Sequence, residues 1–169
     1  LAAAAALLVI FSVLSETEEP HNTSSVVQVD ADIEGLRDRY TKILGNREDQ
    51  VTVMVYMIGS DLESDGAGAA SRDIAEMLAA PLGDRVRLVL QTGGASSWET
   101  PGIDGGVCQR FELRDGVLQK KEDLGSFSTV EPEAVADFIR WASEHYPANR
   151  NILIFWDHGG GTAMGFGCD

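Results

Sequence analysis

Cysteine, histidine and basic residues are scarce in this sequence, and each scarcity argues against a class of protein. Two cysteines, Cys108 and Cys168, are too few for a disulfide framework and lack the C-x-x-C spacing of a metal site. The three histidines form no H-E-x-x-H motif and no cluster, which argues against a zinc site. The chain has 13 Lys and Arg against 27 Asp and Glu, and no basic run that could neutralise a row of phosphates. We therefore assign no metal ligands and predict no nucleic-acid partner.

The chain has one long hydrophobic run, at its N-terminus. Residues 1–14 are apolar apart from Ser12, and the polar stretch SETEEPHNTSS follows at once. This length suits the core of an export signal better than a membrane span, which needs about 20 residues. A buried helix is the alternative. We expect an export-signal or anchor remnant with its linker at 1–29, one domain at 30–169, and a secreted or membrane-anchored extracellular protein of the bacterial type.

Buried strands and amphipathic helices alternate along the remaining chain. Continuous apolar stretches predict parallel strands buried on both faces at Val51–Ile58, Val86–Gln91 and Asn151–Trp156. Helical periodicity and stop signals predict helices at Asp30–Gly45, at Ser71–Ala80, and from Thr129 or Glu131 to Pro147. This order predicts an α/β fold, with an open, mainly parallel sheet and helices on both of its faces.

The stretch CQRFELRDGVLQKKE breaks this alternation. Its residues alternate in character around Asp115-Gly116, a pair that favours the tight turn of a β-hairpin. We predict a peripheral β-hairpin that lies outside the parallel sheet, and a small packed side chain for Cys108 at its start.

Polar and glycine-rich segments follow all three predicted strands. Ligands of open α/β sheets bind beyond the carboxyl ends of the strands. IGSDLES follows the first strand and DHGGG follows the third, while a long surface loop containing Trp98 follows the second. The two polar segments are therefore expected to meet at one edge of the sheet, with the second loop nearby.

Three explanations of His158 are open. It could be a structural side chain bonded to loop carbonyls. HGGG also matches the oxyanion loop of α/β-hydrolase esterases, but no G-x-S-x-G elbow follows it in this sequence. In the third explanation the ring is a catalytic base, because a titratable group at a strand's carboxyl end, followed by glycines, lies where substrates bind. A noncatalytic peptide-binding α/β domain would use the same strand ends.

The order and spacing of these pieces resemble the clostripain family of caspase-like cysteine peptidases. The resemblance rests on VYMIGSDLES, the helix after it, the glycine-rich loop with Trp98, and ILIFWDHGGG…GFGCD, from about Val51 to Asp169. It implies a caspase-like fold and an endopeptidase with a His-Cys dyad. His158 would be its general base or acid, and the Gly159 N–H would belong to its oxyanion hole.

The resemblance also implies a partner segment. The nucleophilic cysteine of the family lies at the end of the next parallel strand, so it would come from a heavy chain or C-terminal segment of the same precursor, formed by self-processing. Cys168 follows His158 by ten residues in a glycine-rich loop, which does not suit a rigidly held nucleophile. The family's preference implies peptide substrates cleaved after Arg or Lys. Calcium dependence is implied as possible, without an EF-hand loop in this sequence.

Four further residues are predicted around the substrate cleft: Ser60, Asp61, Trp98 and Asp157. Asp61 could equally form an Asx turn, and Trp98 could equally pack within its loop. Asp157 could orient the imidazole, but adjacent side chains on a strand diverge, which favours a capping role in the loop.

Overall fold

The computed structural model describes residues 49–160 and Phe166. The predicted export segment and linker, the predicted helix Asp30–Gly45 and Cys168 lie outside the described residues. Residues 50–160 and Phe166 belong to one compact unit. Its elements are β1 (Val51–Ile58), α2 (Ser60–Ser64), α3 (Ala69–Ala79), β2 (Val86–Gly93), β3 (Cys108–Arg114), β4 (Val117–Gly125), α4 (Pro132–His145) and β5 (Arg150–Trp156).

The five strands form one open sheet in the order β4-β3-β2-β1-β5. β1 runs parallel to β2 on one side and to β5 on the other, which confirms the three predicted parallel strands. β3 runs antiparallel to β2, and β4 runs antiparallel to β3. The fold is therefore a mixed α/β sheet with a parallel centre, and the sequence-based fold class is confirmed.

The predicted hairpin is present and peripheral: its two antiparallel strands lie at one edge and extend the parallel strands into one mixed sheet. β3 pairs with β2 from Leu88 opposite Leu113 to Thr92 opposite Gln109. Six of the seven residues of β3 are buried, and the strand is paired on both edges, with β2 and with β4. The turn itself is as predicted: Asp115 (φ 53°) and Gly116 (φ 72°) both adopt the left-handed conformation of a tight hairpin turn.

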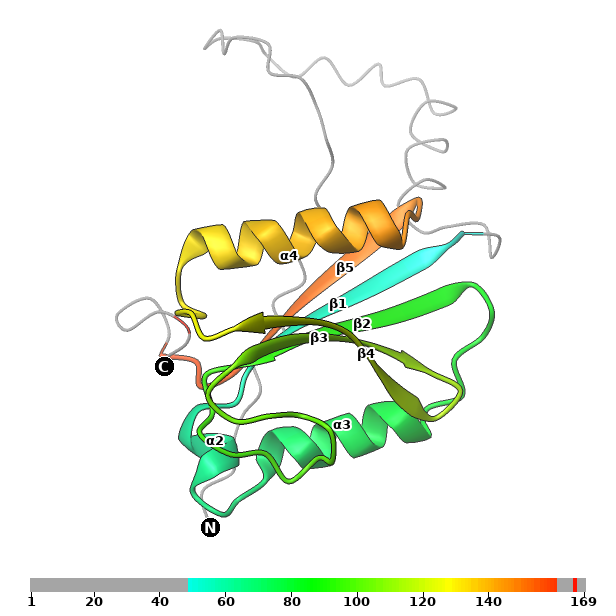
Figure 1. The fold of residues 1–169 in the computed structure, drawn as a ribbon. Helices are drawn as coiled ribbons and strands as arrows, with labels where there is room; N and C mark the ends of the chain where they lie inside the picture. The colour runs from blue at the N-terminus through cyan, green and yellow to red at the C-terminus, as the bar shows by residue number, and fades with distance from the viewer. Residues whose placement is uncertain (1–48, 161–165, 167–169) are drawn as a thin grey trace, which may run out of the picture. The chain divides into compact units, whose positions relative to one another are not determined.

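Helices cover both faces of the sheet (Figure 1). α4 packs on one face, where alternate residues of β1 meet Phe138 and Ala142. α3 packs on the opposite face with Ile74 against Val55 and Met57. Because successive side chains of a strand point to opposite faces, β1 feeds both clusters. Phe138 and Ile74 are fully buried, and each such burial contributes about 2 kcal/mol.

β5 is less buried than the sequence predicted. Among the described residues it pairs with β1 alone, and of its seven residues only Leu153 is fully buried. The prediction assumed that a continuous apolar strand is buried on both faces of the sheet. Ile154, Phe155 and Trp156 instead remain half-buried at the sheet's edge.

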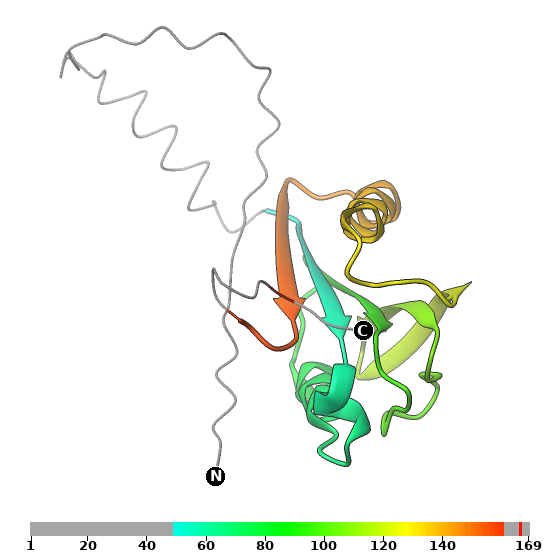
Figure 2. The ribbon, with the colours of Figure 1, turned by 90° about the vertical axis from the view of Figure 1, so that its left-hand side faces the viewer.

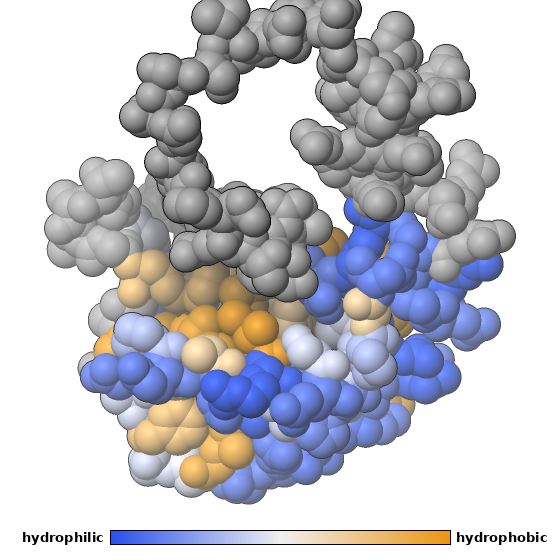
Figure 3. All heavy atoms as spheres, turned by 90° about the horizontal axis from the view of Figure 1, so that it is seen from above, coloured by the Kyte–Doolittle hydropathy of each residue, from blue (hydrophilic) through white to orange (hydrophobic). Residues whose placement is uncertain are grey.

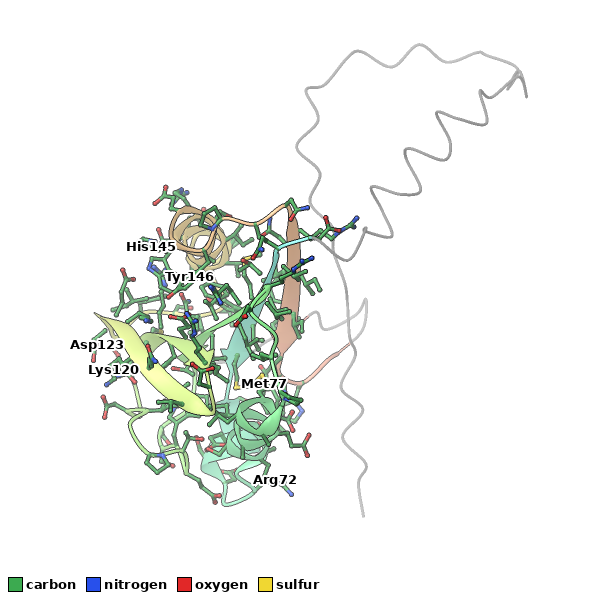
Figure 4. The ribbon with its side chains drawn as sticks, turned by 90° about the vertical axis from the view of Figure 1, so that its right-hand side faces the viewer. Arg72, Met77, Lys120, Asp123, His145 and Tyr146 are labelled. Carbon is green, nitrogen blue, oxygen red and sulfur yellow. The ribbon has the colours of Figure 1, made fainter. Side chains whose placement is uncertain are left out.

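The surface of the unit combines polar and apolar regions. On α3, Met77 points toward the sheet while Arg72 points away from it (Figure 4). Viewed from the α4 side, hydrophilic residues dominate one flank and apolar residues gather in the centre and on the other flank (Figure 3). No helix within 49–160 is both long and apolar enough to cross a membrane.

Candidate functional site

Two consecutive residues after β1 bond to two consecutive residues after β5. Ser60 Oγ donates a hydrogen bond to Asp157 Oδ1 at 2.7 Å. His158 Nε2 lies 2.8 Å from Asp61 Oδ1. Each bond joins residues 97 positions apart in the sequence. The structure therefore brings Ser60, Asp61, Asp157 and His158 together at the carboxyl edge of the sheet.

Parallel pairing explains this meeting. Met57 lies opposite Trp156 at the end of the β1–β5 ladder, so the two chains leave the sheet at the same level. Figure 2 shows the ends of β1 and β5 side by side, with α2 directly after β1. On the other side of β1, Gly59 N donates to Gly93 O at 2.8 Å, which continues the pairing with β2 to the last residue before Ser60.

The chain turns sharply at Ser60. Within IGSDLES the structure has a short helix, α2, that begins at Ser60. Ser60 has φ of 45°, a value that L-residues with a side chain rarely adopt. It is also buried, with 7% of its surface exposed. Such strained backbone persists only where surrounding contacts hold it, and here the hydrogen bond to Asp157 is one of them.

Glu63 holds α2 in place through hydrogen bonds. Its carboxylate is buried and accepts hydrogen bonds from Ser71 N (2.9 Å), Ser71 Oγ (2.5 Å) and Glu99 N (2.8 Å). Ser71 lies in the first turn of α3, where backbone N–H groups lack partners within the helix and favour negative charge. Glu63 thus ties α2 to α3 and to the loop after β2.

Trp98 packs close to the strained residue. A Cβ atom at Gly59 would lie 3.0 Å from two atoms of the Trp98 ring, so only glycine leaves room for it. Trp98 is half-buried and packs on the α3 side of the core. Its Nε1 is buried and has no acceptor among residues 49–160. The structure thus shows Trp98 as loop packing next to the site, and its predicted contact with substrate stays a prediction.

The Asp61–His158 pair is open to solvent. The two side chains are 59% and 52% exposed. The hydrogen bond from His158 lowers the pKa of Asp61 below its ordinary value. Asp61 is therefore ionised at neutral pH. The pair places an imidazole and a carboxylate where a substrate could reach them.

Gly159 directly follows the histidine and is exposed. It forms an antiparallel bridge with Phe166, and the Phe166 ring stacks edge-on against Phe155 of β5 at 5.2 Å. Phe166 therefore lies beside both Gly159 and β5. The predicted oxyanion role of the Gly159 N–H remains a prediction.

The described residues contain no cluster of three or more Asp, Glu, His or Cys side chains that could hold a metal ion. Cys108 is buried, and its thiol lies 3.6 Å from Phe127 O, which is the packed position predicted for it.

Glu63 is the residue that sequence reasoning missed. A glutamate two positions after Asp61 suggests an exposed helical residue, and no local pattern pairs it with a serine eight positions later. Its role depends on the contact between α2 and α3, which no local sequence pattern indicates.

Comparison with known proteins supports the fold. No family model matches the chain, and no curated protein matches it. Among solved structures, a cysteine protease of B. fragilis superposes with a TM-score of 0.51 at 21% identity, over 67% of this chain and 92% of that one.

Two structures from Bacteroides thetaiotaomicron agree with this. A clostripain in complex with the peptide inhibitor BTN-VLTK-AOMK has a TM-score of 0.51 at 15% identity, over 67% of this chain and 93% of that one. A secreted cysteine protease with an irreversible peptide inhibitor has a TM-score of 0.52 at 21% identity, over 66% of this chain and 30% of that one. At these identities the likeness shows the fold. The chain has the fold of these cysteine proteases.

Proposed function

We propose that this chain supplies the histidine of a clostripain-like cysteine endopeptidase. The observation that supports this most directly is the His158 ring, half-exposed at the carboxyl edge of a parallel sheet and bonded to Asp61. The likeness in fold to three cysteine proteases supports the same conclusion. The sulfur of the His-Cys dyad would come from a segment outside this sequence.

The proposed chemistry is acyl transfer through a thiolate. The imidazole of His158 takes the proton from the thiol, and the sulfur forms a bond to the peptide carbonyl carbon. The C–N bond then breaks, and the imidazolium gives its proton to the leaving amine. Water hydrolyses the thioester and restores the thiol. The Gly159 N–H would stabilise the oxyanion, a contribution of about 3 kcal/mol for one well-placed donor.

The edge of β5 suits the partner segment. Within the described residues the outer edge of this strand has no paired strand, and its apolar residues Ile154, Phe155 and Trp156 are incompletely buried. An added parallel strand would complete the hydrogen-bond ladder and cover these side chains. It would also bring its own carboxyl end next to His158. We therefore propose that the cysteine-bearing heavy chain or C-terminal segment pairs here.

Substrate preference, self-processing and export are parts of the same proposal. A net charge of −14 favours encounter with peptides that carry Arg or Lys. The inhibitor bound to the solved clostripain has lysine before its AOMK group. Self-cleavage into light and heavy chains and secretion are proposed from the resemblance. A calcium requirement is proposed from the resemblance alone, and no step of the mechanism depends on it.

The test uses the complete enzyme with its cysteine-bearing segment. We expect hydrolysis of Arg- and Lys-peptide aminomethylcoumarins, and we expect iodoacetamide and His158→Ala each to abolish it. His145→Ala is the matched control, because His145 lies at the exposed end of α4 and should leave turnover unchanged.

Three outcomes would contradict the proposal. Unchanged turnover in His158→Ala would remove the histidine from the mechanism. Hydrolysis of p-nitrophenyl esters that resists iodoacetamide would favour the esterase. Peptide binding without hydrolysis would favour a noncatalytic domain.

A further inference from the structure

We propose that Asp61 is the positioning residue of His158, rather than a substrate contact. It accepts the hydrogen on Nε2 and so leaves Nδ1 as the ring nitrogen that exchanges a proton with the thiol. The contact between Asp61 and Nε2 concerns this chain alone. The proton exchange between Nδ1 and the thiol rests on the proposed function.

The hydrogen-bonding capacity of the two groups determines the tautomer. An ionised carboxylate can only accept, so Nε2, 2.8 Å from Asp61 Oδ1, must carry the hydrogen in this contact. A neutral imidazole has one N–H, and its other nitrogen, Nδ1, then holds the lone pair. The lowered pKa of Asp61 is consistent with this, since it keeps the carboxylate charged at neutral pH.

Asp61 is in place because α2 is held at two points. Ser60, directly before it, is bonded to Asp157 and adopts a left-handed backbone conformation. Glu63, two residues after it, is buried and bonded to Ser71 and Glu99. The helix direction is therefore set independently of His158. Asp61 approaches the imidazole from rigid backbone, as a group that orients another must.

Asp157 is the competing candidate, because it directly precedes His158. Its Oδ1 accepts the hydrogen bond from Ser60 Oγ, and this contact draws the carboxylate toward the start of α2. Adjacent side chains on an extended chain diverge. Asp157 therefore links the loop after β5 to the start of α2, and Asp61 contacts the ring.

Because the Asp61–His158 pair is exposed, variants of Asp61 can test its positioning role without unfolding the protein. Ion pairs between exposed side chains contribute little to stability, so variants of Asp61 should fold. A loss of orientation affects turnover much more, because a misplaced reacting group can lower the rate by about 10²-fold. A substrate contact would behave differently, since losing uniform binding raises KM without changing kcat.

The first test reads the tautomer by ¹⁵N NMR of the histidine-labelled protein, with His158→Ala identifying the His158 signals. We expect the Nε2–H form in the wild type and in Asp65→Asn, an exposed matched control on the turn that ends α2. In Asp61→Ala we expect both neutral tautomers. An unchanged tautomer in Asp61→Ala would overturn the proposal, whether or not the protein is a peptidase.

The second test measures kinetics on the complete enzyme. We expect Asp61→Ala to lower kcat about 10²-fold with KM nearly unchanged, and Asp61→Glu to recover part of the loss. A raised KM with unchanged kcat would show that Asp61 binds substrate instead. If the wild type is inactive on peptides, the proposed function fails while the tautomer result still decides the role of Asp61.

Discussion

Ser60 and Asp157 are joined by a 2.7 Å hydrogen bond between the end of β1 and the end of β5, at a point where Ser60 has φ of 45°. The bond couples a strained backbone conformation to the loop that carries the histidine. Positive φ in a residue with a side chain costs about 1 to 2 kcal/mol. The hydrogen bond therefore helps to hold Ser60 in a strained backbone conformation next to the site.

Replacing Ser60 should separate the strain from the hydrogen bond. Ser60→Ala and Ser60→Gly both remove the bond to Asp157, but glycine adopts positive φ without penalty. We expect Ser60→Gly to be about 1 kcal/mol more stable than Ser60→Ala in urea unfolding. At Ser143, an exposed position inside α4, the order should reverse, because glycine costs about 1 kcal/mol relative to alanine in a helix. The same order at both positions would contradict the strain at Ser60.

Glu63 should stabilise the packing of α2 against α3 and the loop after β2. Glu63→Gln replaces one accepting oxygen with an NH₂ group that faces the donors of Ser71 or Glu99. Leaving buried donors unsatisfied should lower the free energy of unfolding by about 3 kcal/mol. Glu76→Gln, on the exposed side of α3, should stay within about 0.5 kcal/mol. Equal midpoints in urea for the two variants would show that the buried carboxylate contributes nothing.

Arg110 connects β3 to α4 through a buried guanidinium. Its Nε donates to Gln91 Oε1 at 2.8 Å, its two terminal nitrogens contact Glu122 and Asp137, and it stacks over Trp141. Lysine cannot reproduce this planar set of donors. We expect Arg110→Lys to lower the free energy of unfolding by about 2 kcal/mol. Arg114→Lys, at the exposed end of the same strand, should change it by less than about 0.5 kcal/mol.

Acid should weaken the contact between the hairpin and the loop after β2. Gln109 Nε2 donates to both Asp104 and Asp123, and Lys120 donates to Asp104. Lys120 and Asp123 both lie on β4 (Figure 4). The hydrogen bond from Lys120 lowers the pKa of Asp104, and the bond from Gln109 lowers the pKa of Asp123.

The sign of the pH effect follows from these lowered values. A carboxyl group whose folded pKa is below its unfolded value stabilises the fold fully above the unfolded pKa of about 3.9, and this contribution is lost as pH falls through the folded pKa. The urea midpoint of the wild type should therefore fall between pH 6 and pH 3. The double variant Asp104→Asn, Asp123→Asn should have a lower urea midpoint than the wild type at pH 6. Its midpoint should also fall less between pH 6 and pH 3. An equal fall of the urea midpoint in both proteins would show that other titratable groups cause the acid sensitivity.

The parts of the fold that depend on local pattern were predictable. The apolar run Val51–Ile58 identified β1 with its exact bounds, and the stripe Ile74, Met77 and Leu78 identified the helix that packs on the sheet. The hairpin turn at Asp115-Gly116 was equally local. Its place in the sheet was not, because pairing of β3 with β2 depends on distant residues that carry no shared signature.

The sequence by itself determined where β1 and β5 end, and therefore that Ser60, Asp61, Asp157 and His158 would lie at one edge. This follows from continuous apolar runs that end at polar residues, a pattern that extends over a few residues of backbone. Only the tertiary structure decided which of these residues touch. The β1–β5 register, the direction of α2 and the burial of Glu63 place the Asp61 carboxylate, rather than that of Asp157, against the imidazole. Contacts between residues 97 positions apart depend on how whole elements pack, and no local pattern encodes that geometry.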